Sequence, residues 1–238
     1  MAAAILFNTI AHATTLFYYV HILRAIAAIQ AEPTSTIVRD FMDFKTKFFT
    51  MWGVAAQLVL FALCVLHDVA RLLPADNAVR RGARSLRDLI LVAVAAPGAL
   101  TVSAMFWSLF KLDRNMVMPA ELDALIPTWL NHTMHTFVVV LVVVQMLAEP
   151  HYAPSKTATL TVGTFFTVAY NSVFFYEYWL SRRWIYPVFS ILSWPGRVAL
   201  IGFTSVMFLT LSLVVRSFVK TRWGPPPKIS HKSTKKQN

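Results

Sequence analysis

The sequence predicts an all-α integral membrane protein, a bundle of six transmembrane helices with both termini in the cytosol. Of its 238 residues, 57% are hydrophobic and 14% are charged, a ratio outside the range of ordinary soluble domains. Six apolar segments approach the roughly 20 residues that cross a bilayer. Strict alternation of apolar and polar residues, the mark of a membrane β-barrel, is missing, so helices must satisfy the backbone in lipid.

The six predicted spans follow one another with only short connections, and no soluble domain or internal repeat separates them. They lie near 4–28, 48–67, 89–110, 126–147, 158–180 and 195–218. Pro97-Gly98 falls inside the third span and predicts a kink there, because proline cannot donate a helical hydrogen bond. We therefore expect a six-helix transmembrane catalytic domain over residues 1–219. A basic, disordered cytosolic tail should follow over residues 220–238.

Signals at the ends of the spans refine this arrangement. Ser85-Leu86-Arg87-Asp88 precedes the third span and resembles a capping box, with Ser85 as the cap and Asp88 facing the helix dipole. Trp184-Ile185-Tyr186-Pro187 lies between the last two spans, where Trp and Tyr are typical of interface anchors. A lid over an entrance is the alternative for this segment.

The distribution of basic residues predicts the orientation. Lys and Arg are more numerous on the side that holds the 67–88 loop and the C-terminal tail, so the positive-inside rule places both termini in the cytosol. The last four residues, Lys235-Lys236-Gln237-Asn238, look like a dilysine retrieval signal, which is read only in the cytosol. We expect a multi-pass protein of the endoplasmic reticulum, with the plasma membrane as a second location.

Composition also limits the partners. The formal net charge is +11, but its basic residues stand in short clusters between apolar runs, which indicates a membrane protein rather than a nucleic-acid-binding one. The basic tail is expected to lie near anionic lipid headgroups. Cys64 is the only cysteine, so the chain has no intramolecular disulfide and no cysteine motif for a metal.

The segment from Asn131 to Thr136 is the most informative part of the chain. It places two imidazoles, His132 and His135, and one amide in a stretch that otherwise spans the membrane. Polar groups in a bilayer are costly and mark functional sites. Asn131 and His135 are four residues apart and share a helix face. This face must look into a protein interior or a cavity.

Thr50, at the start of the second span, lies on the same half of the membrane as His135. A hydroxyl beside an imidazole is the minimum for nucleophilic catalysis, because the His takes the proton as the oxygen attacks. With ~1.5 Å rise per residue, His135 lies about 12 Å along its helix from Pro127, whereas Thr50 is about 5 Å from Lys47. The two side chains meet only if the second helix starts deeper or one helix is tilted.

Other interpretations remain open at this stage. His132 and His135 could bind a metal with His67, Asp68 and Asp88, although these three fall at the opposite end of their spans. Glu177 could orient His135 as a third catalytic member, or pair with Arg182 at the interface. The polar stripe could also line a small transporter or channel, or form a helix–helix contact in a regulatory membrane protein.

Several segments together resemble the androgen-induced / androgen-dependent TFPI-regulating protein family over roughly residues 40–205. The segments are Lys47-Phe48-Phe49-Thr50, Ser85-Leu86-Arg87-Asp88, Phe106-Trp107, Asp113-Arg114, Ile126-Pro127-Thr128-Trp129-Leu130-Asn131-His132-Thr133-Met134-His135-Thr136 and Trp184-Ile185-Tyr186-Pro187. The run around the His pair is highly specific, and the other segments support it.

The resemblance implies six spans with cytosolic termini and a threonine hydrolase of fatty acid esters of hydroxy fatty acids (FAHFA). The family's nucleophile falls on Thr50 and its catalytic base on His135. Asn131 or His132 could then bind the oxyanion or orient the base. This chemistry needs no cofactor. The expected partners are the branched lipid ester and the surrounding membrane lipids, and the sequence does not define an oligomeric state.

Overall fold

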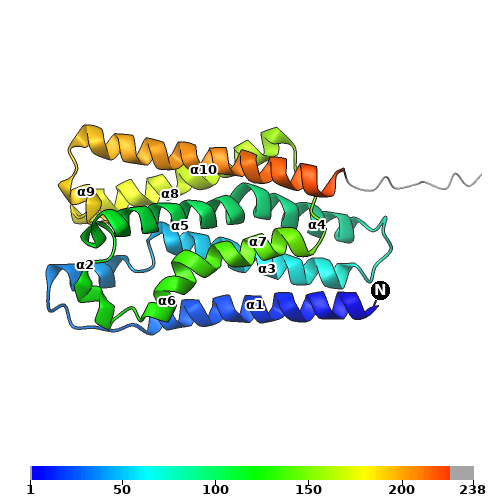
Figure 1. The fold of residues 1–238 in the computed structure, drawn as a ribbon, viewed down its shortest axis with the longest axis horizontal. Coiled ribbons are helices and arrows are strands. Elements are labelled where there is room, and N and C mark those ends of the chain that lie inside the picture. Colours follow the sequence, from blue (N-terminus) through cyan, green and yellow to red (C-terminus); the bar gives the residue numbers. More distant parts are fainter. Residues whose placement is uncertain (1, 226–238) are drawn as a thin grey trace, which may run out of the picture.

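The structure, a computed structural model, describes residues 2–225, and within that range every regular element is helical (Figure 1). The long elements are α1 (Ala2–Ala28), α3 (Phe49–Ala70), α4 (Ala78–Ile90), α5 (Ala96–Asp113), α7 (Val138–Ala148), α8 (Lys156–Ser181) and α10 (Trp194–Trp223). The short ones are α2 (Thr36–Phe44), α6 (Thr128–His132), α9 (Val188–Ile191), the 3-10 turns η2 (Arg114–Met116) and η3 (Ala120–Ala124), and the π-helical turns η1 (Leu91–Ala95) and η4 (Thr133–Phe137).

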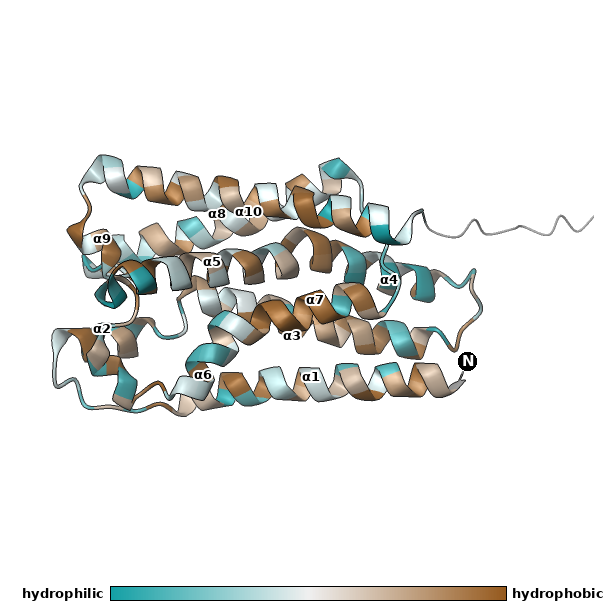
Figure 2. Ribbon diagram, viewed as in Figure 1, coloured by the Kyte–Doolittle hydropathy of each residue, from teal (hydrophilic) through white to brown (hydrophobic). Residues whose placement is uncertain are grey.

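Six helical runs are long and apolar enough to cross a membrane, which confirms the predicted fold class. The third run joins α4, η1 and α5, and the fourth joins α6, η4 and α7. Both ends of the described chain lie at the same end of the bundle as α4, whereas α2 and α9 lie at the opposite end (Figure 1). We call these the α4 end and the α2 end. Figure 2 shows hydrophobic residues along the long helices and a hydrophilic group at α4.

The third run starts earlier than predicted, and the expected cap at Ser85 is wrong. Asn77 is the cap, and its side-chain oxygen accepts hydrogen bonds from the Val79 and Arg80 amides at 2.9 Å and 3.4 Å. Ser85 lies in the middle of α4. The apolar run begins only at residue 89, but Ala and Arg are good helix formers and extend the helix by three turns toward its N-terminus.

Two further boundaries differ in detail. The distortion expected at Pro97-Gly98 takes the form of a π-helical turn, in which the Ala96 amide donates to the Leu91 carbonyl. Helix α10 continues to Trp223 and therefore takes in the first four residues of the predicted tail. The dilysine segment Lys235-Lys236 lies outside the described residues.

A group of buried charged side chains joins the helices at the α4 end. Arg87 is fully buried and donates hydrogen bonds to Asp88 Oδ1 and the Pro150 carbonyl, both at 2.8 Å. It also forms an ion pair with Glu149 at 2.9 Å. His151 contacts the same Asp88 oxygen at 2.8 Å. Buried charges are tolerated when they are paired in this way.

The cluster extends to α1 through His12. Its Nδ1 lies 2.7 Å from Asp68 Oδ2, and its Nε2 lies 3.0 Å from Gln145 Oε1. Gln145 in turn donates to Glu149 at 2.6 Å. The polar residues of α1, α3, α4 and α7 at this end therefore form one connected network. Asp88, which the sequence placed at a helix N-terminus, lies instead in the last turn of α4 and pairs with Arg87 there.

Replacing Arg87 by Met should destabilise the protein by about 3–5 kcal/mol, because the substitution leaves Asp88 and Glu149 buried without their cation. Arg81→Met is the matched control, since Arg81 is exposed in the same helix, and its effect should stay within about 0.5 kcal/mol. Reversible unfolding of the purified protein in detergent measures both. Equal stabilities of the two variants would contradict a structural role for the cluster.

Candidate active site

The start of α3 lies inside the bundle rather than at its surface. The connection from α1 contains the additional helix α2, whose N-cap Ser35 accepts a hydrogen bond from the Val38 amide at 3.2 Å. Phe41 and Phe44 anchor this helix in the core. Because the chain turns inward after α2, Thr50 is partly buried in the first turn of α3. The sequence places Thr50 less deep along its helix than His135, and this inward turn brings the two to the same depth.

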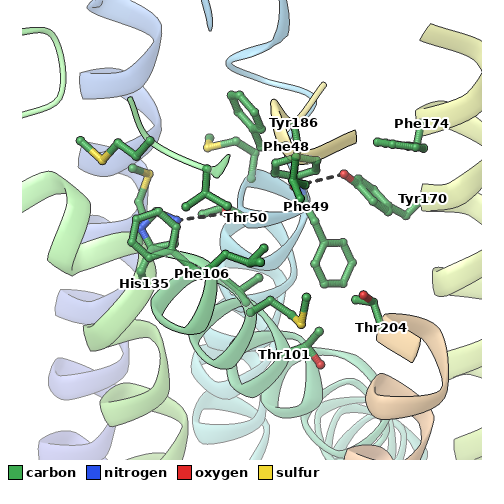
Figure 3. Close-up of a pocket in the computed structure, with 18 of the residues that line it drawn as sticks. Phe48, Phe49, Thr50, Thr101, Phe106, His135, Tyr170, Phe174, Tyr186 and Thr204 are labelled. Carbon is green, nitrogen blue, oxygen red and sulfur yellow. Dashed lines mark hydrogen bonds between the residues drawn. The ribbon is translucent and has the colours of Figure 1, made fainter. Parts of the chain in front are cut away.

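Thr50 and His135 are in contact. The Thr50 Oγ1 lies 3.3 Å from His135 Nε2 (Figure 3). The other ring nitrogen, Nδ1, lies 3.0 Å from the Asn131 backbone carbonyl and 2.8 Å from Asn131 Oδ1. A carbonyl only accepts hydrogen bonds, so Nδ1 must carry the proton. A neutral His135 then presents an unprotonated Nε2 to the Thr50 hydroxyl, which donates to it.

A distorted helical turn and two aromatic side chains hold the His135 ring in place. Thr133–Phe137 forms a π-helical turn, a distortion frequent at functional sites. The Trp107 indole N–H donates to the His135 carbonyl at 3.1 Å and stabilises this turn. The imidazole stacks on Phe106 with ring centres 3.5 Å apart and planes 9° from parallel. The ring is therefore fixed on one face and at one nitrogen.

Asn131, and not Glu177, is hydrogen-bonded to His135. Glu177 forms an ion pair with Lys47 at 2.8 Å and makes no contact with His135. His132 is exposed, and its Nδ1 lies 3.2 Å from Thr136 Oγ1 on its own helix. It stands outside the cavity that His135 lines. Sequence spacing alone could not show which of the two histidines lines the cavity, because the π-helical turn changes which residues share a helix face.

Tyr186 holds the first turn of α3. The Phe49 amide donates to the Tyr186 hydroxyl at 2.7 Å, and the Tyr170 hydroxyl donates to it at 3.2 Å (Figure 3). Burial raises the pKa of Tyr186 to about 12, so its hydroxyl stays protonated at physiological pH. Trp184 and Ile185 are buried beside it, so the segment predicted to anchor at the interface packs into the protein instead.

Thr50 and His135, which we call the dyad, line an apolar cavity of about 180 Å³. Its walls come mainly from α3, α5, α8 and α10, and they are dominated by aromatic and aliphatic side chains (Figure 3). His135 and Thr50 face each other in the left half of Figure 3, and Thr101 and Thr204 lie away from them at the lower right. Asn131 also lines this cavity. The arrangement suits a lipid chain whose polar group reaches the dyad.

A metal site at the His pair is not formed among residues 2–225. The two groups of described residues that could hold an ion are His12, Cys64 and Glu149, and His67, Asp68 and Glu149. Both groups lie at the α4 end and contain neither His132 nor His135. Arg87 binds Glu149 at 2.9 Å and His67 Nδ1 at 3.0 Å, so a guanidinium already engages donor atoms of the second group.

These features define a class of protein: a six-span helical membrane protein that holds a paired hydroxyl and imidazole in an apolar cavity within its bundle. The chain belongs to the FAR-17a/AIG1-like protein family, whose model matches residues 2–220.

It is 33% identical to the androgen-induced gene 1 protein of Homo sapiens over 174 residues, which cover 71% of this chain and 73% of that protein. It is 30% identical to the human androgen-dependent TFPI-regulating protein over 178 residues, covering 75% and 77%. The same-named protein of Mus musculus is 30% identical over 188 residues, covering 79% and 81%. No solved structure matches the chain.

The tautomer of His135 can be measured directly. In protein carrying ¹⁵N-labelled histidine, His135 should show a protonated Nδ1 and an unprotonated Nε2, because the Asn131 carbonyl accepts only from Nδ1–H. His135→Ala assigns the signal. Asn131→Ala should lower the fraction of the Nδ1-protonated tautomer, because it removes the side-chain acceptor. A predominantly Nε2-protonated ring in the unmodified protein would contradict the proposed pairing with Thr50.

Proposed function

We propose that this protein is an intramembrane ester hydrolase with Thr50 as nucleophile and His135 as base. The observation that carries the proposal is the 3.3 Å contact between Thr50 Oγ1 and an Nε2 whose proton is held on the other ring nitrogen. Hydroxyl nucleophiles need such a base, and the base needs an orienting group. Asn131 supplies that group at 2.8 Å. Family membership alone does not define an activity, so the proposal rests on this geometry and on the resemblance described above.

The reaction proceeds through an acyl-enzyme. Thr50 Oγ1 attacks the ester carbonyl while its proton moves to His135 Nε2. The tetrahedral intermediate collapses, the bond to the alcohol oxygen breaks, and His135 returns the proton to that oxygen. Water, deprotonated by the same nitrogen, then attacks the acyl-threonine. The bond to Thr50 Oγ1 breaks, His135 returns the proton to that oxygen, and the fatty acid leaves. During each step the imidazolium is stabilised by its Nδ1–H bonds to the two Asn131 oxygens.

The developing oxyanion has two candidate donors. The Thr50 amide lies in the first turn of α3, where helical amides lack intrahelical acceptors, and it has no hydrogen-bond acceptor among the described residues. The positive end of the helix dipole favours negative charge at the same place. The Asn131 side-chain NH₂ group is the second donor, because only its oxygen is used by His135. Such donors contribute about 10²–10³ in rate.

The proposed substrate is a fatty acid ester of a hydroxy fatty acid. The apolar lining of the cavity supports a substrate with long hydrocarbon chains, and the resemblance to the androgen-induced / androgen-dependent TFPI-regulating proteins supports this class of branched ester. Ion conduction would need polar groups along a path, whereas aromatic and aliphatic residues dominate these walls. The lining therefore favours a lipid ligand over an ion.

We further propose that the substrate enters from the leaflet at the α2 end, where the dyad lies. The positive-inside rule makes this the non-cytosolic leaflet. The dilysine sequence Lys235-Lys236 supports residence in the endoplasmic reticulum, as the sequence predicts. The location of the activity would then be the lumenal half of that membrane.

Thr50→Ala and His135→Ala should each lower hydrolysis of a FAHFA substrate by at least about a thousandfold, because nucleophile and base act as a unit. The double variant should be no worse than either single variant. Thr50→Ser should retain activity, since it keeps the hydroxyl. The measurement is fatty acid release by purified protein in detergent or liposomes, with expression and thermal stability recorded in parallel.

Two matched controls accompany these variants. His132→Ala removes the neighbouring, exposed imidazole, and Thr46→Ala removes an exposed hydroxyl shortly before α3. Both should keep most of the activity. Substantial hydrolysis by Thr50→Ala, or an equal loss in His132→Ala and His135→Ala, would overturn the assignment of the dyad.

A further inference from the structure

Within the described part of the chain, the cavity that holds the dyad contains one fixed positive charge and no acidic residue. Among the described residues that line it, Lys45 is the only Lys or Arg, and no Asp or Glu is present. The other walls are mostly apolar. An ammonium group that faces an apolar wall loses hydration and gains no counter-charge, which is costly. A ligand with a negative charge would offset this cost.

The neighbouring basic residues show the contrast. Lys47, two residues further along, pairs with Glu177 at 2.8 Å, and Arg114 pairs with Asp123 at 2.6 Å. Arg183 pairs with both Asp40 and Asp43 of α2. Lys45 forms no ion pair with an acidic side chain within residues 2–225. Its Nζ donates instead to the Ile29 carbonyl, a neutral acceptor.

The position of Lys45 suits recognition of a substrate beside the dyad. It ends α2 and is the C-cap residue of that helix. Thr50 is five positions further along the chain, so the two Cα atoms are at most about 17 Å apart. An ammonium group has three N–H donors, and one is used by Ile29. Two donors and the full charge have no partner among the described residues.

We propose that Lys45 binds the free carboxylate of the lipid ester and thereby selects acidic esters over neutral ones. This inference rests on the proposed function, because it places the ester carbonyl at Thr50. In an ester of a hydroxy acid, the carboxylate belongs to the half that leaves as the alcohol. Charge-assisted hydrogen bonds are strong where water is excluded. The distance between Lys45 and Thr50 then also limits the spacing between carboxylate and ester in the substrate.

The test compares one lipid ester as the free acid and as its methyl ester, each with unmodified protein, Lys45→Met, Lys45→Arg and Lys111→Met. Methionine keeps most of the unbranched side chain without the charge. Lys111 is an exposed lysine at the same end and lies outside the cavity. Unmodified protein should prefer the free acid. Lys45→Met should raise KM for the free acid by about 10- to 100-fold and leave KM for the methyl ester nearly unchanged. Lys45→Arg should retain the preference, and Lys111→Met should match the unmodified protein.

A second measurement separates this proposal from the catalytic one. An ether-linked analogue of the same lipid cannot be hydrolysed, and its binding as the free acid should weaken in Lys45→Met by a similar factor. If no ester is hydrolysed but this binding difference is present, the hydrolase proposal fails and the carboxylate site stands. If the esters are hydrolysed and Lys45→Met has the same KM values for the free acid and the methyl ester as the unmodified protein, the Lys45 proposal is overturned.

Discussion

The pair of hydrogen bonds that fixes His135 Nδ1 on Asn131 is the contact on which the candidate site depends. A histidine within an apolar bundle must find partners for both nitrogens, since an unpaired polar group there is costly. The Asn131 carbonyl and side-chain oxygen occupy Nδ1, and this leaves Nε2 for Thr50. The rest of the local structure supports that choice: the π-helical turn aims the ring, Trp107 bonds the His135 carbonyl, and Phe106 covers one face.

The buried charges at the α4 end and the polar groups that line the cavity at the α2 end differ in their pairing. At the α4 end, Arg87, Asp88 and Glu149 pair with one another, so the network is connected and structural. At the α2 end, the cavity-lining residues Thr50 and Lys45 have N–H groups that no described residue accepts. Spare donors beside an apolar volume favour a ligand that brings oxygen atoms and hydrocarbon together. A lipid ester with a carboxylate has that composition.

The sequence predicts much of the fold, because hydrophobic length and composition define membrane-spanning helices almost independently of tertiary contacts. The sequence also predicts that Thr50 and His135 lie in the same half of the membrane. The details that it misses depend on tertiary structure: Ser85 is not a cap because α4 starts at Ala78, and Glu177 is taken by Lys47. The inward turn after α2 and the role of Tyr186 at Phe49 have no local sequence signal.

Covalent trapping of the nucleophile tests the central claim most directly. A fluorophosphonate with a long alkyl chain reacts with activated hydroxyl groups, and peptide mass spectrometry locates the adduct. The account predicts a single adduct on Thr50 that forms in unmodified protein, is absent in His135→Ala, and is slowed by excess lipid ester. An adduct on another Ser or Thr with Thr50 unmodified, or labelling of Thr50 that is unaffected by loss of His135, would contradict the dyad as the source of reactivity.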